Sequence, residues 1–218
     1  MTEISPLSIS LAFCACHVCF YAVFVPRWLL RHRGPGPEET ADDGSGSGPV
    51  PAQPGPVQAP AAPAPDSASR LPLALHAVAM GVLYAGIDAA FLGAAPRFLV
   101  APQRAAGGLT MLAGAALAAW ALAVFKSWRL QARIGPRHEL CTAGPFRRVR
   151  HPIYLAMDLL ALGSWLWLPT LAVALGVVLV ASTGALRARG EEQLLLRAYG
   201  ARYETYRRQT WRFLPGVY

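Results

Sequence analysis

The sequence has 218 residues, of which 54% are hydrophobic and only 15% are charged. This composition excludes an ordinary soluble domain, because the few charged residues are separated by long apolar runs. The net charge of +8 could attract nucleic acid, but basic residues that flank apolar runs are typical of membrane proteins. We therefore expect membrane lipids, and no nucleic acid, as partners.

Four apolar runs predict the membrane helices. A helix needs about 20 apolar residues to cross the hydrocarbon core of a bilayer. Three runs fit one helix each: residues 4–26, 71–96 and 105–125. The fourth run, residues 151–186, is too long for one helix, and Pro169 predicts a break within it, because proline lacks an amide hydrogen and clashes with the preceding turn. The prediction is an all-α membrane protein with about five transmembrane helices.

The basic residues predict the orientation, since Lys and Arg are retained on the cytoplasmic side of membranes. With five spans, most of the basic residues fall on one side of the membrane. They lie in residues 126–150, in residues 187–212 and at both ends of the segment between the first two spans. Only Arg97 and Arg104 fall on the other side. We expect the N-terminus outside and the C-terminus in the cytoplasm. Because its positive charges follow the apolar core, the first span is predicted to be retained rather than cleaved. Nineteen arginines against one lysine, together with abundant Ala, Gly and Pro, are typical of a GC-rich bacterial genome. We therefore expect the bacterial inner membrane as the location.

Residues 34–70 consist almost entirely of Gly, Pro, Ala, Ser and acidic residues. Such a segment cannot bury a core and predicts a disordered linker. It divides the chain into an N-terminal helix, residues 1–33, and a compact domain, residues 71–218. A Pro-rich linker could also display binding motifs, so a non-catalytic membrane scaffold is an alternative function from another class.

Some polar residues of the first two spans favour packing over chemistry. Cys14, Cys16 and Cys19 surround His17, but the segment has no paired CxxC and no second ligand cluster elsewhere, so no metal site is predicted. His76 in the second span has no partner motif nearby in the sequence, and we interpret it, like Asp88, as a packing residue.

The C-terminal tail predicts an amphipathic helix. Leu195, Tyr199, Tyr203 and Tyr206 recur at a helical spacing. Gly200 costs a helix about 1 kcal/mol, so we expect the helix to divide there.

The stretch GPFRRVRHPIYL, residues 144–155, places polar residues at the start of the fourth span. Pro152 suits the first turn of a helix. On that helix His151, Tyr154 and Asp158 share one face. Ionisable residues at a membrane usually line a cavity or pair with partners. The alternative is that His151 and Tyr154 only anchor the helix at the interface.

A second polar group, Arg187 with Glu191 and Glu192, stands where the fifth span returns to the cytoplasm. Arg187 and Glu191 are four residues apart and share a helix face. Both polar groups reach the same boundary at the two ends of one hairpin, which predicts a common site.

These two motifs carry a resemblance. Residues 131–215, approximately, resemble the isoprenylcysteine carboxyl methyltransferase family and its phospholipid methyltransferase relatives. The resemblance consists of GPFRRVRHPIYL, then an apolar hairpin, and then R-x-x-x-E-E-x-L-L-x-x-x-Y-G-x-x-Y-x-x-Y. The resemblance implies an integral membrane enzyme that uses S-adenosyl-L-methionine to methylate a lipophilic acceptor at the cytoplasmic face. A phospholipid amine or a small thiol is the alternative acceptor.

The resemblance also implies roles for individual residues. The cofactor pocket would be formed by Gln131, His138, Glu139, Leu140, Cys141, Phe146, His151, Pro152, Ile153, Tyr154 and Glu191. The catalytic residues would be Arg187, which corresponds to the arginine at the methyl acceptor, Glu191 and Asp158.

The sequence departs from the family pattern at three positions. Phe146 replaces a tyrosine, Ala156 replaces a glycine, and Asp158 stands where an apolar residue is usual. One hypothesis is that Asp158 lines the acceptor channel and favours an amine, hydroxyl or thiol over a carboxylate, which it would repel. The alternative is an aspartate that serves helix packing.

Overall fold

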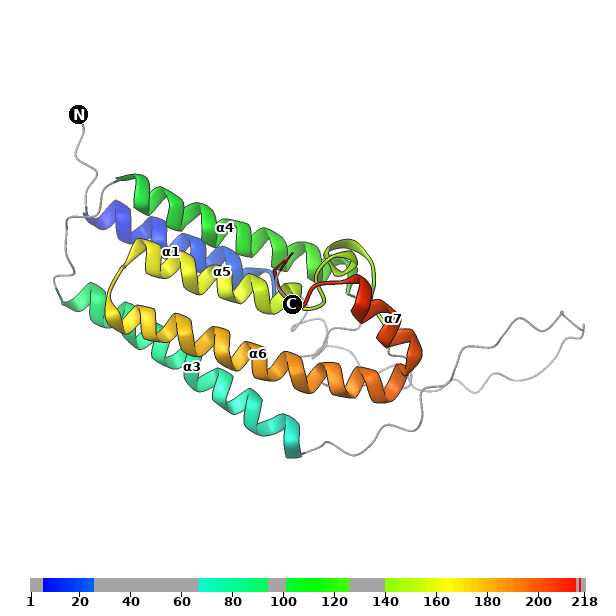
Figure 1. Cartoon of the computed structure of the whole chain (residues 1–218). Helices are drawn as coiled ribbons and strands as arrows, with labels where there is room; N and C mark the ends of the chain where they lie inside the picture. The colour runs from blue at the N-terminus through cyan, green and yellow to red at the C-terminus, as the bar shows by residue number, and fades with distance from the viewer. Residues whose placement is uncertain (1–5, 26–66, 94–100, 126–139, 215, 217–218) are drawn as a thin grey trace, which may run out of the picture.

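The computed structural model describes residues 6–25, 67–93, 101–125, 140–214 and 216. Within these residues there is no strand, and the predicted all-helical class is confirmed (Figure 1). The elements are α1 (Pro6–Ala22), α3 (Ser67–Leu92), α4 (Ala101–Val124), the short 3-10 helix η1 (Gly144–Arg147), α5 (Pro152–Trp167), α6 (Leu171–Tyr199) and α7 (Ala201–Gln209).

Three helices are long and apolar enough to cross a membrane: Arg70–Leu92, Pro102–Val124 and Leu171–Tyr199. The other two predicted spans correspond to α1, with 17 residues, and α5, with 16 residues. Both are apolar but shorter than the usual span of about 20 residues. The structure therefore supports three spans by length, and the count of five stays a prediction.

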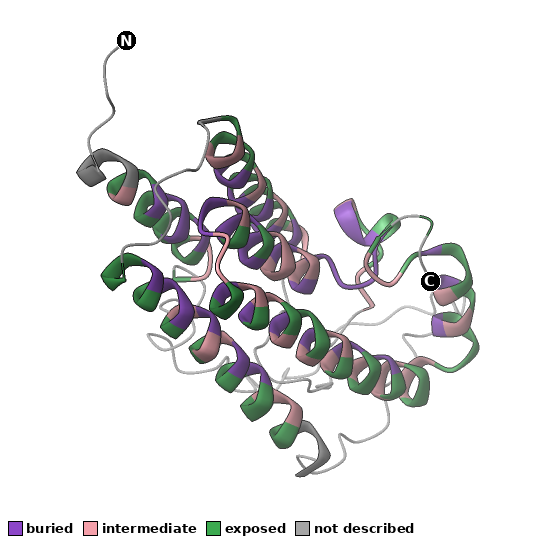
Figure 2. Cartoon of the chain, turned by 60° about the vertical axis from the view of Figure 1, so that its left-hand side comes forward, coloured by how far each residue is buried: buried purple, intermediate pink, exposed green. Residues whose placement is uncertain are grey.

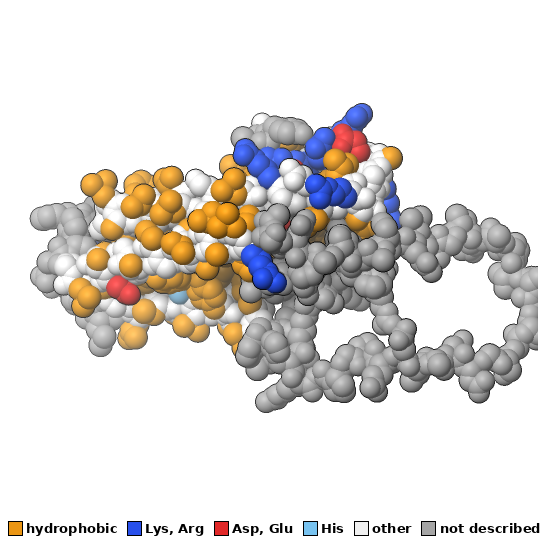
Figure 3. All heavy atoms as spheres, turned by 90° about the horizontal axis from the view of Figure 1, so that it is seen from below, with side chains coloured by type: hydrophobic (Ala, Val, Ile, Leu, Met, Phe, Trp, Pro, Cys, Tyr) orange, Lys and Arg blue, Asp and Glu red, His pale blue; other side chains and the backbone are white. Residues whose placement is uncertain are grey.

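The helices pack in two groups that α5 and α6 join. α4 packs against α5 and α1, while α3 packs against α6 (Figure 1). Buried residues lie mainly on the facing sides of the helices and exposed residues on the outer sides (Figure 2). Many exposed residues are large and apolar, such as Leu92, Leu109 and Leu171. Figure 3 shows hydrophobic side chains along the bundle and basic side chains gathered towards one end, as expected for a bundle surrounded by lipid.

Glycines permit the closest contact, between α4 and α5. A Cβ atom on Gly163 would lie 2.6 Å from Cγ of Met111 and 2.7 Å from the carbonyl oxygen of Gly107. At Gly163 the backbone of α5 therefore packs directly against the backbone and the Met111 side chain of α4. Small residues at such contacts are typical of helices that associate by van der Waals packing in lipid.

The predicted break and the predicted tail are both found. α5 ends at Trp167, Pro169 follows, and the Thr170 hydroxyl caps α6 by accepting a hydrogen bond from the Val173 amide at 3.3 Å. α6 then continues through the span to Tyr199. Gly200, with a positive φ of 51°, separates it from α7.

Several expectations meet the structure only in part. Residues 67–70, the last four of the predicted linker, form the start of α3. The other linker residues, 34–66, lie outside the described residues. His17 is buried, and its Nε2 lies 3.2 Å from the Ser164 hydroxyl of α5, so it helps to join α1 to α5. Asp88 is exposed, so the packing role predicted for it is wrong.

Replacing Gly163 by alanine tests the contact between α4 and α5. The added methyl group would overpack it, and we expect a loss of about 1 to 3 kcal/mol and a fall in melting temperature of about 2 to 10 °C. Gly81→Ala is the matched control, because nothing lies within 4 Å of a Cβ atom at Gly81. Thermal unfolding of the detergent-purified proteins compares the two. Equal melting temperatures would show that the helices do not approach as described.

Candidate active site

The candidate site lies at the end of the bundle where α5 begins. The chain after α7 folds back beside the segment that precedes α5. The amide of Arg150 donates to the Trp211 carbonyl at 2.8 Å, the amide of Trp211 donates to the Arg148 carbonyl at 2.9 Å, and the His151 amide donates to the Arg212 carbonyl at 3.2 Å. The residues of the RHP motif are thus held by the tail, which is far away in sequence.

A buried carboxylate joins these segments to α6. Glu192 is 6% exposed and accepts hydrogen bonds from Arg150 Nε at 2.9 Å and from Arg212 Nη2 at 2.6 Å. Arg150 also donates to the carbonyl oxygens of Arg207 and Thr210. We call Glu192, Arg150 and Arg212 the Glu192 clasp. It fixes α6, the start of α5 and the tail against one another.

His151 stands between the two glutamates. Its ring is buried, with Nδ1 3.6 Å from Oε2 of Glu191 and Nε2 3.4 Å from Oε1 of Glu192. Burial alone would lower the pKa of His151, but the two neighbouring carboxylates outweigh burial and raise the pKa above its usual value. The two carboxylates therefore favour the protonated imidazole, in which both ring nitrogens are donors.

Tyr154 connects the two groups of polar residues that the sequence placed at the ends of the hairpin. Its hydroxyl donates a hydrogen bond to Oε1 of Glu191, and the guanidinium of Arg187 lies 5.2 Å from the centre of its ring. The structure thus brings His151, Tyr154, Arg187 and Glu191 together. Glu191 keeps 27% of its side chain exposed, so this carboxylate is also open to a ligand.

The remaining candidates for the cofactor pocket are spread around this centre. Phe146 is buried, its ring lies 5.4 Å from that of Phe125, and its carbonyl accepts a hydrogen bond from the Tyr206 hydroxyl at 2.8 Å. Pro152 is buried at the first turn of α5, whereas three others are partly exposed: Leu140, Cys141 and Ile153. Three predicted residues lie outside the described part of the chain: Gln131, His138 and Glu139.

Two departures from the family pattern have different surroundings. Ala156 is fully buried at the contact with α4, where a Cβ on Gly114 would lie 2.8 Å from its carbonyl oxygen. A small residue at this position serves packing. Asp158 is partly buried one turn beyond Tyr154 and makes no hydrogen bond or ion pair with another described residue. Both hypotheses for Asp158 therefore stay open.

Sequence reasoning missed the Glu192 clasp. In the sequence Glu192 stands out only as the neighbour of Glu191, and the motifs predict no role for Arg150 or Arg212. Glu192 stands in the E-E pair and Arg150 in the RHP motif, so their motifs were a signal. No local signal marks Arg212, because its contact depends on the chain turning back after α7.

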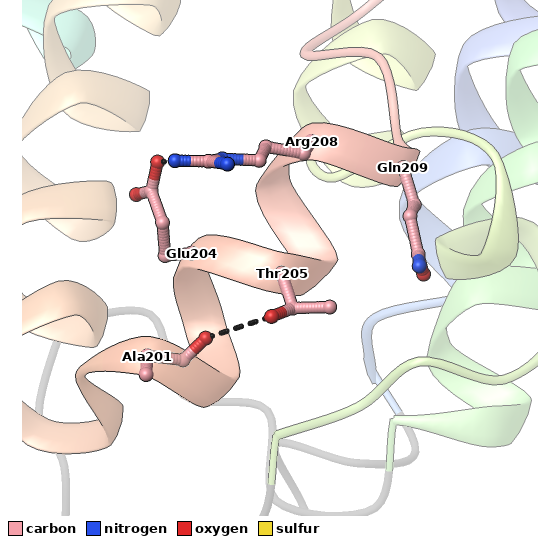
Figure 4. A pocket seen from close by; sticks show the side chains of 5 residues that line it. All are labelled: Ala201, Glu204, Thr205, Arg208 and Gln209. Atoms are coloured by element: carbon pink, nitrogen blue, oxygen red, sulfur yellow. Dashed lines mark hydrogen bonds and ion pairs between the residues drawn. The ribbon is translucent and has the colours of Figure 1, made fainter.

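A separate hollow of about 410 Å³ lies on α7 and is not part of this site. Its lining residues hold one another: Arg208 Nε donates to Glu204 at 3.3 Å, and the Thr205 hydroxyl donates to the Ala201 carbonyl at 3.0 Å (Figure 4). None of the candidate site residues lines it.

The Glu192 clasp makes a prediction about stability. In Glu192→Gln the two arginines lose a buried counter-charge, and we expect a loss of about 3 to 5 kcal/mol. Glu204→Gln is the control, since it removes a carboxylate that also pairs with two arginines but keeps 28% of its side chain exposed against 7% for Glu192, and little change is expected. Denaturant unfolding of both variants makes the comparison. A Glu192→Gln variant as stable as the control would contradict the structural role of the clasp.

The comparison with protein families agrees with this site. Residues 102–202 match the family model described as phospholipid methyltransferase. The matched part includes α4, α5 and α6, and with them His151, Tyr154, Arg187 and Glu191. No curated protein matches the sequence. The expected resemblance is therefore confirmed over residues 102–202: this part of the chain is similar to the phospholipid methyltransferase family, and the three long apolar helices point to an integral membrane protein.

Proposed function

We propose that the protein transfers a methyl group from S-adenosyl-L-methionine to a lipophilic acceptor at the cytoplasmic face of the membrane. The observation that carries this proposal is the convergence of His151, Tyr154, Arg187 and Glu191 at one end of the bundle, inside the part that matches the family. The cytoplasmic location rests on the basic residues of this end.

The chemical groups of the site fit S-adenosyl-L-methionine. The cofactor has an amino group and ribose hydroxyls that need acceptors, and a carboxylate that needs donors. Glu191 is a partly exposed acceptor. His151 is a buried donor, and its ring, 3.6 Å and 3.4 Å from the carboxylates of Glu191 and Glu192, can also serve a cofactor carboxylate. When bound, the cofactor supplies a methyl group attached to a positively charged sulfur.

The residues of the chain position the reacting groups and exclude water from them. The hydroxyl of Tyr154 holds the Glu191 carboxylate, and the Glu192 clasp holds the segment that carries His151. Positioning of this kind can supply most of the acceleration of a methyl transfer, because the reaction needs an in-line approach in a site without water. Arg187, with its planar donors, is suited to orient an anionic part of the acceptor.

A phospholipid amine is the second candidate acceptor. The description of the matched family favours it, and a phospholipid can enter from the bilayer between the helices. Its phosphate would suit Arg187. Methylation of phosphatidylethanolamine, tested against a small lipophilic thiol and a prenylated cysteine compound, separates the candidates.

Binding of labelled S-adenosyl-L-methionine tests the proposal directly. In detergent-purified protein, Glu191→Ala and His151→Ala should each weaken binding by about 10- to 100-fold, because each removes a charge-assisted hydrogen bond. The matched control is Glu204→Ala, which removes a similarly exposed carboxylate from α7, outside the site, and should leave binding unchanged. No saturable binding to the folded unmodified protein would contradict the function and leave a membrane scaffold as the better interpretation.

Asp158 offers a second test, on acceptor preference. If Asp158 lines the acceptor channel, Asp158→Asn should raise the rate with a carboxylate acceptor relative to an amine acceptor, because the repelling charge is removed. A change of about tenfold in the ratio corresponds to roughly 1.4 kcal/mol. Methyl-transfer rates with both acceptors measure the ratio. An unchanged ratio would assign Asp158 to helix packing.

A further inference from the structure

A buried histidine on α3 lies beside the candidate site. His76 is 4% exposed, and its ring centre is 6.1 Å from that of Tyr154. A Cβ atom on Gly184 of α6 would lie 3.9 Å from Cε1 of His76 and 4.0 Å from Cβ of Tyr154. His76 therefore lies where α3, α5 and α6 meet. The packing role predicted for it from the sequence did not include this neighbourhood.

One tautomer of His76 satisfies both its ring and Thr183. Nδ1 lies 2.9 Å from the hydroxyl oxygen of Thr183. The Thr183 hydroxyl lies 2.7 Å from the carbonyl oxygen of Leu179, to which threonine hydroxyls in helices commonly donate. In the tautomer that keeps this hydrogen bond, the Thr183 oxygen accepts from Nδ1 of His76. In the neutral ring the other nitrogen, Nε2, then has a free lone pair and is a hydrogen-bond acceptor.

The second ring nitrogen of His76, Nε2, is buried and lacks a hydrogen-bond partner in the described part of the chain. A buried acceptor without a partner is unfavourable, and such groups commonly mark sites where a ligand completes the bonding. Thr183 and Arg187 are four residues apart on one face of α6, so this acceptor lies about one helical turn deeper than Arg187.

We propose that His76 determines acceptor specificity: its Nε2 accepts a hydrogen bond from the head group of the methyl acceptor. The acceptor is then a lipophilic molecule with an N–H, O–H or S–H group. A carboxylate or a quaternary amine has no such hydrogen and would leave Nε2 without a partner. This inference rests on the proposed function for the identity of the ligand, and on the geometry of His76 for the kind of head group.

Two probes with the same chain and the same head-group charge test the proposal, one with N–H groups and one with N-methyl groups in their place. Dodecylamine is protonated near neutral pH and carries N–H groups, whereas dodecyltrimethylammonium has the same chain and charge but no N–H. Binding is measured on the full chain in nanodiscs of phosphatidylcholine, whose head group has no N–H. We expect dodecylamine to bind roughly five- to tenfold more tightly, the worth of about one hydrogen bond.

Two variants separate the nitrogens of His76. In His76→Asn the side chain can still reach Thr183 but has no atom at the position of Nε2, so the preference for dodecylamine should disappear. Glutamine is longer, and the carbonyl oxygen in His76→Gln can replace Nε2 as an acceptor, so part of the preference should return. An unchanged preference in His76→Asn would overturn the proposal.

A spectroscopic measurement on the unmodified protein tests the same proposal and does not depend on whether a variant folds. In protein labelled with ¹⁵N-histidine, the unprotonated Nε2 signal of His76 should shift on addition of dodecylamine and stay in place with dodecyltrimethylammonium. Equal responses to both probes would overturn the proposal. Neither probe measurement requires S-adenosyl-L-methionine. A protein that distinguishes the probes but fails to bind the cofactor would therefore contradict the proposed function and leave the role of His76 standing.

Discussion

A buried carboxylate, Glu192, holds the functional end of this protein together. An uncompensated charge is costly in a buried place, so Glu192 requires cationic partners with good geometry. It takes them from Arg150, ahead of α5, and Arg212, after α7. These residues are far apart in sequence and become neighbours only when the tail folds back. The positions of His151 and of the first turn of α5 depend on this arrangement.

The length of α6 explains how one helix serves both the membrane and the site. It has 29 residues and therefore measures about 43 Å, well above the roughly 30 Å of a hydrocarbon core. Its first half is apolar. Thr183, Arg187 and Glu191 then follow at intervals of four residues, on one face that meets His76 and Tyr154. The polar residues thus extend from the end of the helix into the bundle.

Much of this arrangement could be predicted from the sequence, because the signals were local. The apolar runs, Pro169 and Gly200 predicted the helices and their breaks, and the two motifs predicted that His151 and Glu191 lie at the same end. Both ends of α5 follow from prolines that are visible in the sequence, Pro152 at its first turn and Pro169 just after its last residue. The contact of His76 with Thr183 is a pairing between two helices that are distant in sequence, and no periodicity within either helix indicates it.

The distribution of the polar residues separates two tasks. The residues suited to the cofactor lie on the segment before α5, on α5 and on the charged end of α6, all within the part of the chain that matches the family. His76 belongs to α3, which precedes that part. Under the proposed role of His76, a substitution on the face of α3 that packs against α6 changes which head group is accepted and leaves the residues suited to the cofactor untouched. The α3–α6 contact thus gives a physical basis for an acceptor preference that is independent of the cofactor residues.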